Sequence, residues 1–223
     1  MSGSISVVML GATGAVGGHT ARTLAGLPEL TRLSLLGRRP AEGLAGGAIE
    51  QHVIDIFAPS SYRNLLPGHR TAICALGVGE PSKMSKAEFV RIDRDAVLDF
   101  ASACKQAGVR HFELLGSAGA SATSSLFYLR TKGQLEEGLK ALGFERLSLF
   151  QPSMILTPTN RYGLLQAITL FAFPLLEPLL VGPLRKARGI RVDKLGAAIA
   201  MNVLTDGTGV ETLQWDDFMK LTA

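Results

Sequence analysis

The N-terminal residues contain the feature that most constrains the fold, an apolar run that leads through three spaced glycines into a helical pattern. The run Ile5–Leu10 predicts a buried strand, and Ala15–Leu27 predicts a helix. Gly11 permits a tight turn out of the strand, Gly14 lets a ligand approach the backbone, and Gly17 lets the helix lie close to the sheet. The sequence therefore predicts a strand–turn–helix unit at the start of a parallel sheet.

This unit is suited to binding a phosphate-bearing ligand. The start of the helix offers unpaired N–H groups and a positive dipole end to phosphate oxygens. A glycine triplet between a strand and a helix, with a second strand at the expected distance, is typical of dinucleotide-binding proteins. The alternative is a tight turn that binds nothing. The predicted cofactor-binding residues of the turn are Gly11, Ala12, Thr13, Gly14, Ala15, Val16 and Gly17.

Strand and helix patterns alternate along the rest of the chain. Further strands are predicted at Leu33–Leu36, His52–Ile54, Thr71–Leu76, His111–Leu115, Leu147–Phe150 and Val210–Leu213. Further helices are predicted at Ser60–Leu66, Ser85–Ala107, Ser125–Leu142, Asp193–Leu204 and Trp215–Leu221. The alternation predicts an α/β fold, a doubly wound parallel sheet of the Rossmann type. We expect one domain over residues 1–223, with residues 156–190 and 205–223 forming a small C-terminal extension on the substrate side.

Composition excludes several classes of protein. The chain is 47% hydrophobic and 19% charged, which suits a folded domain, and its net charge of +4 comes from scattered residues without a basic run. We therefore predict no nucleic-acid partner. Cys74 and Cys104 fall on a predicted strand and helix, which indicates reduced core thiols, and the isolated histidines predict no metal site. The N-terminus lacks a signal-peptide pattern, so we expect a cytoplasmic protein.

The segment Leu164–Leu184 is rich in Leu and Phe. Prolines at 174, 178 and 183 and the charge of Glu177 interrupt it, so a membrane-spanning helix is not predicted. A lid over a substrate pocket, an oligomer contact and a membrane-surface patch remain open, and we expect a monomer or homodimer.

The end of the second strand bears on the choice of nucleotide. The chain continues there with Arg38 and Arg39, and no acid follows until Glu42. Arg38 stands 21 positions after Gly17 (38 − 17), near the spacing of roughly 20 at which these folds contact the adenosine ribose. A guanidinium suits a 2′-phosphate, so NADP(H) is favoured over NAD(H). The alternative is a solvated turn with two ordinary surface arginines.

Two further runs follow predicted strands, where cofactors lie in such folds. Asp55 and Ile56 stand where an adenine amino group could find an acceptor. Ala75, Leu76 and Gly77 follow the fourth strand.

The predicted helix after the fifth strand carries a candidate catalytic pair. Tyr128 and Lys132 are four positions apart and therefore share one helix face. A lysine ammonium beside a phenol favours the phenolate, which can exchange a proton with a carbonyl or hydroxyl oxygen while a nicotinamide exchanges hydride. Ser117, just past the fifth strand, could hydrogen-bond the same substrate oxygen. Taken alone, such a Tyr/Lys pair is usually structural, and its position in the fold favours catalysis.

These motifs together resemble the short-chain dehydrogenase/reductase superfamily. The runs Leu36–Arg39, Phe89–Asp95 and Tyr128–Gly133 are similar, more specifically, to its atypical Tat-interacting, oxidoreductase-like group. The resemblance implies a Rossmann fold that binds NADPH, with the 2′-phosphate at Arg38 and Arg39. It also implies a catalytic triad of Ser117, Tyr128 and Lys132, and a nicotinamide side that includes Pro152, Met154 and Ile155.

The sequence thus predicts an NADP(H)-dependent oxidoreductase that acts on a small carbonyl compound or secondary alcohol. An alternative is an NADPH-binding regulatory protein with little turnover, because Tyr128 and Lys132 could serve only to hold the nicotinamide ribose. The short stretch between Ser117 and Tyr128 favours that alternative.

Overall fold

The computed structural model describes residues 4–78, 84–157 and 182–223 of the chain. Its centre is a seven-stranded sheet in which all neighbouring strands are parallel. The order is β3 (Ile49–Val53), β2 (Leu30–Gly37), β1 (Ile5–Leu10), β4 (Thr71–Cys74), β5 (His111–Leu115), β6 (Arg146–Phe150) and β9 (Gly209–Leu213). The chain winds outward in one direction from β1 to β3 and in the other from β4 onward. The carboxyl ends of β1 and β4 therefore form the switch point at which such sheets bind ligands.

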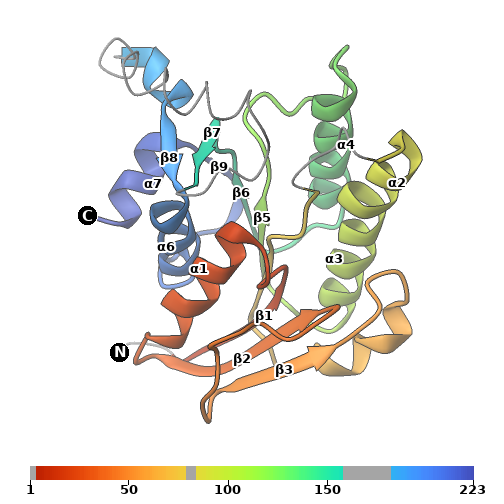
Figure 1. Ribbon diagram of the computed structural model, residues 1–223, viewed down its shortest axis with the longest axis vertical. Helices are drawn as coiled ribbons and strands as arrows, with labels where there is room; N and C mark the ends of the chain where they lie inside the picture. The colour runs from red at the N-terminus through yellow and green to blue at the C-terminus, as the bar shows by residue number, and fades with distance from the viewer. Residues whose placement is uncertain (1–3, 79–83, 158–181) are drawn as a thin grey trace.

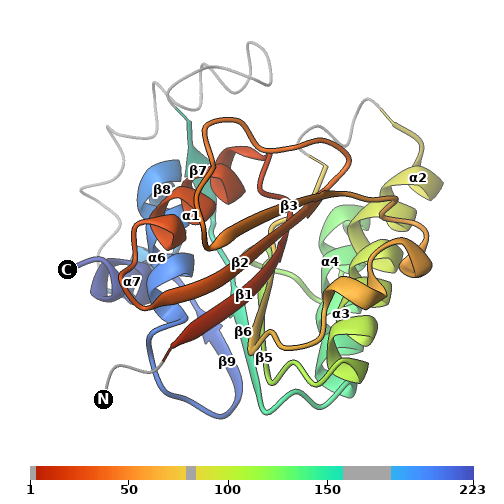
Figure 2. The same cartoon turned by 90° about the horizontal axis from the view of Figure 1, so that it is seen from below.

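Helices cover both faces of the sheet, which confirms the doubly wound α/β prediction (Figures 1 and 2). One face carries α1 (Ala15–Ala25), α6 (Val192–Asn202) and α7 (Trp215–Leu221), and the other carries α3 (Ala96–Gln106) and α4 (Phe127–Ala141). The side chains of alternate residues of β1 point to opposite faces of the sheet. Val7 and Met9 pack with the α1 and α6 cluster, and Val8 and Leu10 pack with the α3 and α4 cluster.

The predicted helix Ser85–Ala107 is divided in the structure. The helix α2 (Lys86–Val90) runs through a π-helical turn, Arg91–Asp95, into α3. Inserted π turns shift the phase of a helix and are frequent at functional sites. Here the turn directs Asp93 inward, where it is 1% exposed.

Other predicted elements also differ from the structure. The helix predicted over Ser60–Leu66 consists of two 3-10 turns, Pro59–Ser61 and Arg63–Leu65, separated by Tyr62 at φ −135°. The third strand begins three residues earlier than predicted, at Ile49, because its edge position leaves it without a continuous apolar run. In the first segment the apolar pattern is too short to distinguish a helix from 3-10 turns, and in the second it is too short to locate the first residue of the strand.

The C-terminal residues contribute to the sheet itself. The strand β9 pairs with β6, and α7 packs on α6, so part of the segment 205–223 extends the sheet and its helical layer. A separate two-stranded ribbon joins β7 (Met154–Leu156) to β8 (Gly189–Arg191). Most of residues 164–184, on which the lid, oligomer and membrane-surface alternatives depend, falls outside the described residues. Among the helices that are described, none has the length and hydropathy needed to cross a bilayer.

Candidate functional site

Close backbone contacts explain why the first and last residues of the glycine triplet after β1, Gly11 and Gly17, carry no side chain. Gly11 has φ +98°, and a Cβ there would lie 2.5 Å from the carbonyl carbon of Ala75 at the end of β4. A Cβ at Gly17 would lie 2.1 Å from the carbonyl oxygen of Gly11. Side chains at these two positions would therefore separate α1 from the sheet and β1 from β4.

The start of α1 is open to a ligand. Its N-cap, Gly14, makes no side-chain capping bond, and the first turn has no acidic residue. Gly14 and Ala15 line two cavities, one on each side of the turn. The N–H groups and the positive dipole end of α1 therefore face open space between two cavities.

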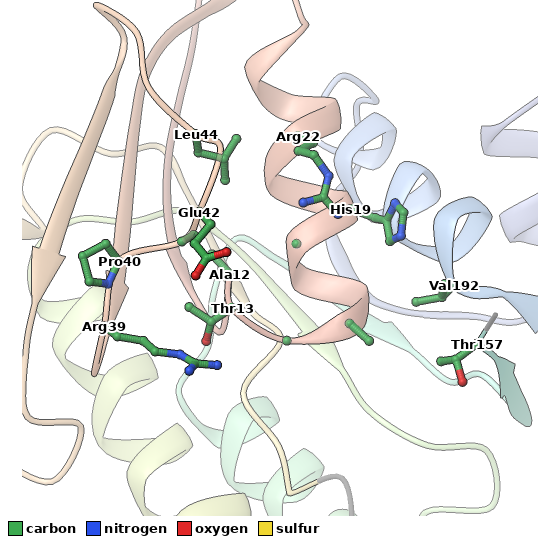
Figure 3. A pocket seen from close by; sticks show the side chains of 14 residues that line it. Ala12, Thr13, His19, Arg22, Arg39, Pro40, Glu42, Leu44, Thr157 and Val192 are labelled. Atoms are coloured by element: carbon green, nitrogen blue, oxygen red, sulfur yellow. The ribbon is translucent and has the colours of Figure 1, made fainter. Parts of the chain in front are cut away.

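The first cavity, which we call the arginine cavity, has a volume of ≈ 360 Å³ (Figure 3). Ala12 and Thr13 of the turn line it together with Arg39 from the loop after β2. Arg22 and His19 line it from α1, and neither residue was predicted to bind a ligand. Arg38 is exposed but lies outside this cavity.

The second cavity, which we call the tyrosine cavity, has a volume of ≈ 480 Å³. It brings together the three predicted catalytic residues: Ser117 from the segment after β5, and Tyr128 and Lys132 from α4. The other predicted residues that line it are Gly14, Ala15, Val16, Ala75, Leu76, Gly77, Pro152 and Ile155. The carboxyl ends of β1, β4, β5 and β6 thus converge on one space.

Lys132 is held by a buried ion pair. Its Nζ donates to Asp93 Oδ1 at 2.5 Å, and the lysine and aspartate side chains are 6% and 1% exposed. The other carboxylate oxygen of Asp93 accepts the backbone N–H of Val78 at 2.8 Å. One carboxylate therefore ties α4 to the loop that follows β4.

Sequence reasoning did not assign Asp93 to the site, although a signal was present. Asp93 follows Val90 by three positions and precedes Val97 by four, so it falls on the apolar stripe of the predicted long helix. An acid on a buried stripe requires a partner, and the partner is the lysine of the candidate catalytic pair.

The loop between Ser117 and Tyr128 folds back on α4. The N–H of Ser121 donates to the carbonyl of Leu129 at 3.1 Å, and Arg130 Nη1 donates to the carbonyl of Ser124 at 2.7 Å. Tyr128 is 36% exposed at the mouth of the tyrosine cavity, and Lys132 Nζ lies 6.0 Å from the centre of its ring. The short connection is therefore compatible with both hydroxyl groups lining one cavity.

Several predicted cofactor residues lie outside both cavities: Gly11, Gly17, Arg38, Asp55, Ile56 and Met154. The two glycines position the turn. Asp55 Oδ1 accepts the N–H of Phe57 at 2.9 Å, and Ile56 belongs to the hydrophobic core. Met154 pairs with Gly189 in the β7–β8 ribbon.

Comparison with solved structures places the fold. MoeE5 in complex with UDP-glucose and NAD superimposes with a TM-score of 0.67 and 17% identity, over 94% of this chain and 76% of that one. Citrobacter triphenylmethane reductase complexed with NADP(H) gives a TM-score of 0.66 and 16% identity, over 95% and 70%. These proteins therefore share the Rossmann-like α/β fold of this chain.

Comparison of sequences is more specific, although no family model matches the chain. Protein HTATIP2 of Rattus norvegicus is 37% identical over 153 residues, which span 68% of this chain and 63% of the rat protein. Protein FMP52 of Lodderomyces elongisporus is 30% identical over 195 residues, which span 79% of this chain and 82% of the fungal protein. The chain belongs to the family of atypical short-chain dehydrogenase/reductase proteins that includes HTATIP2 and FMP52.

The relatives correct one expectation. The fungal FMP52 proteins are named mitochondrial, so the prediction of a cytoplasmic protein is wrong. That prediction used the absence of a signal-peptide pattern at the N-terminus, and the structure adds only that Cys74 and Cys104 are free and buried. Buried thiols are compatible with reducing surroundings but do not identify a compartment.

Proposed function

We propose that this chain is an NADP(H)-dependent oxidoreductase that acts on a carbonyl compound or a secondary alcohol. One observation carries the proposal. A single glycine turn stands between a cavity lined by arginines and a cavity lined by Ser117, Tyr128 and Lys132. A dinucleotide has the matching order of groups: an adenosine that bears the 2′-phosphate, a pyrophosphate and a nicotinamide.

The residues of the turn fit such a cofactor. The uncapped, acid-free start of α1 at Gly14 supplies N–H donors for a pyrophosphate, and Gly14 and Ala15 are shared by both cavities. Ala75, Leu76 and Gly77 would line the nicotinamide side with Pro152 and Ile155. When bound, the nicotinamide supplies hydride to a carbonyl carbon or accepts it from a carbinol carbon.

Residues of the chain would donate or accept the proton that accompanies the hydride. In the reducing direction Tyr128 Oη donates its proton to the substrate oxygen, so that the carbonyl gains one hydride and one proton and becomes an alcohol. Ser117 Oγ would orient that oxygen by a hydrogen bond. Lys132 would stabilise the resulting phenolate and hold the nicotinamide ribose. Asp93 would act as a positioning residue that fixes Lys132 Nζ.

The arginine cavity supports NADP(H) over NAD(H). Arg39 lines it beside Thr13, where a guanidinium could form a fork of hydrogen bonds to a 2′-phosphate. Arg38 was expected to share this role, and its place outside the cavity makes Arg39 the stronger candidate.

Substituting Tyr128 with Phe tests the proposal. With NADPH and a panel of carbonyl compounds, we expect Y128F to lower turnover by about 10²- to 10⁴-fold, the usual contribution of a general acid. The ring remains available to pack on Phe89, whose centre lies 5.7 Å from that of Tyr128, so NADPH affinity should change little. Unchanged turnover by Y128F would exclude the catalytic role.

A second function, an NADPH-binding regulatory protein, is favoured by one observation. Lys132 Nζ is already paired with the carboxylate of Asp93, so the lysine charge is balanced within the cavity. Tight NADPH binding without turnover on any carbonyl compound would support this alternative.

A further inference from the structure

The helix α4 carries a third polar residue in line with the candidate catalytic pair. Glu136 follows Lys132 by four positions and Tyr128 by eight, so the three side chains lie along one side of the helix. Glu136 is 4% exposed. Among the ion pairs of the described residues, Lys132 is joined to Asp93 and not to Glu136. The carboxylate of Glu136 is therefore not needed to balance the charge of the lysine.

The partner of Glu136 is the side-chain amide of Gln151, the first residue after β6. Gln151 Nε2 lies 3.0 Å from each of the two carboxylate oxygens of Glu136. Burial raises the pKa of Glu136, and the hydrogen bond from Gln151 opposes that rise. A neutral amide satisfies both oxygens without neutralising a charge, so the fold maintains this contact against the desolvation of a buried acid.

A glycine directly after β5 makes room for the contact. A Cβ on Gly116 would lie 3.1 Å from Glu136 Oε1 and 3.3 Å from the carbonyl oxygen of Phe150. Gly116 lines the tyrosine cavity, whereas Glu136 is not among the residues that line it. The carboxylate of Glu136 therefore packs against the wall of the cavity and does not face the space inside it.

Backbone hydrogen bonds on either side of Ser117 join it to the segment after β6. The N–H of Gly116 donates to the carbonyl of Phe150 at 2.8 Å, and the N–H of Ala118 donates to the carbonyl of Pro152 at 3.0 Å. The recorded contact of the Ser117 hydroxyl, with the carbonyl of Ala118 at 3.4 Å, is longer than a normal O–H···O bond. The position of that hydroxyl is therefore set by the backbone bonds to the segment after β6.

We infer that Glu136 is a positioning residue for Ser117. By holding Gln151, it fixes the segment after β6 against α4, and the two backbone bonds fix the serine to that segment. The helix α4 thus places Tyr128 and Lys132 directly and the third member of the triad through Glu136. The inference rests on the proposed function, and it adds a residue outside the cavity to the groups on which turnover depends.

Substituting Glu136 with Leu and with Gln tests the inference. E136L removes both acceptors and keeps an apolar, helix-forming side chain at a buried position. E136Q keeps the contact, because two side-chain amides can donate to and accept from each other. The matched control is E137L, since Glu137 is the neighbouring acid of α4 and pairs with Lys140 near the surface.

Amide hydrogen exchange of the free protein gives a readout that needs neither cofactor nor turnover. The amides of Gly116 and Ala118 are compared with that of Val8, which lies in the core on β1 and reports opening of the whole sheet. We expect E136L to speed exchange at the first two amides by about tenfold relative to Val8, the effect of one charge-assisted hydrogen bond. E136Q should change this ratio by less than about threefold, and E137L should leave it unchanged.

Turnover of a carbonyl compound with NADPH shows whether the contact acts through Ser117. We expect E136L to lower kcat by about tenfold while the KM for NADPH stays within about twofold, because the glycine turn and the arginine cavity are not altered. In the S117A background, E136L should lower kcat by less than a further factor of about two. E136Q should keep most of the wild-type kcat.

Unchanged exchange at Gly116 and Ala118 in E136L would overturn the inference, as would an E136Q variant that is as slow as E136L. So would a loss of kcat by E136L that is as large in S117A as in the wild type, because the carboxylate would then act independently of the serine. If wild-type protein reduces no carbonyl compound, the proposed function fails together with the role of Glu136 in it. The exchange rates report separately whether Glu136 holds the segment after β6.

Discussion

At the scale of single residues, the buried ion pair of Lys132 and Asp93 is the contact that most directly links the candidate site to the stability of the fold. Both side chains are more than nine-tenths buried, and Asp93 also accepts the N–H of Val78. Removing one partner of a buried pair leaves an uncompensated charge, whereas removing both is often tolerated. The pair therefore makes the stability of the molecule depend on the candidate site.

We expect Asp93→Asn to lower the free energy of unfolding by about 3–5 kcal/mol. Asp95→Asn is the matched control, because Asp95 pairs with Arg94 near the surface of the same π turn and its loss should cost no more than about 1 kcal/mol. Urea denaturation measures both. The double variant Asp93→Asn/Lys132→Met should recover most of the loss, and a double variant no more stable than Asp93→Asn would argue against an uncompensated ammonium as the cause.

The candidate site could be predicted from the sequence only in part. Spacing alone was enough to select Tyr128 and Lys132, because positions four apart share a helix face. Spacing could not separate Arg38 from Arg39, since neighbouring loop residues have no fixed periodicity, and it could not select Arg22, whose position depends on how α1 meets the loop after β2. Asp93 lies on the apolar stripe of the predicted helix, but that stripe does not identify the partner of a buried acid, because Lys132 comes from a separate helix.

At the scale of elements, a buried polar network joins β5, β6, β9 and α6 at the opposite end of the sheet from the cavities. Asn202 Nδ2 donates to Glu113 Oε1 at 2.9 Å, while Glu113 Oε2 has no hydrogen-bond partner among the residues that the structure describes. Burial raises the pKa of Glu113 to about 8. Burial, followed by the charges of Arg146 and Arg70, lowers the pKa of His111 to about 3. These two side chains, 3.5 Å apart, therefore meet as neutral groups rather than as an ion pair.

The network predicts how stability depends on pH. Between the unfolded pKa of 4.5 and the folded pKa of about 8, Glu113 binds more protons in the folded state than in the unfolded state. Its contribution to the free energy of unfolding therefore falls as pH rises through this range. Between pH 3 and pH 6.5, the folded pKa of about 3 and the unfolded pKa of 6.5 make the contribution of His111 to the free energy of unfolding rise with pH. The two contributions offset each other from pH 4.5 to 6.5, and stability should fall from pH 6.5 to 8.

Urea denaturation across pH 5 to 9 tests this prediction, with Glu113→Gln as the variant that cannot titrate. We expect the decline above pH 6.5 to be smaller in E113Q than in the wild type. Parallel curves for the two proteins would assign the decline to other groups.

At the scale of the whole molecule, the parallel sheet brings distant parts of the chain to one edge. The turn after β1, the loop after β4 and the residues after β5 and β6 meet at the switch point, so the cavities draw on residues from Ala12 to Val192. This architecture was predictable because strand and helix patterns alternate. The pairing of β9 with β6 was not, because the pattern of an edge strand carries little information about its partner.

The most direct measurement is calorimetric titration of the purified chain with NADPH and with NADH, accompanied by thermal unfolding in the presence of each. We expect both coenzymes to bind once per chain and to raise the unfolding temperature by mass action, with NADPH the tighter of the two. If neither coenzyme produces binding heat or a shift in unfolding temperature, the glycine turn does not hold a dinucleotide, and the roles given to Tyr128, Lys132 and the arginines do not stand.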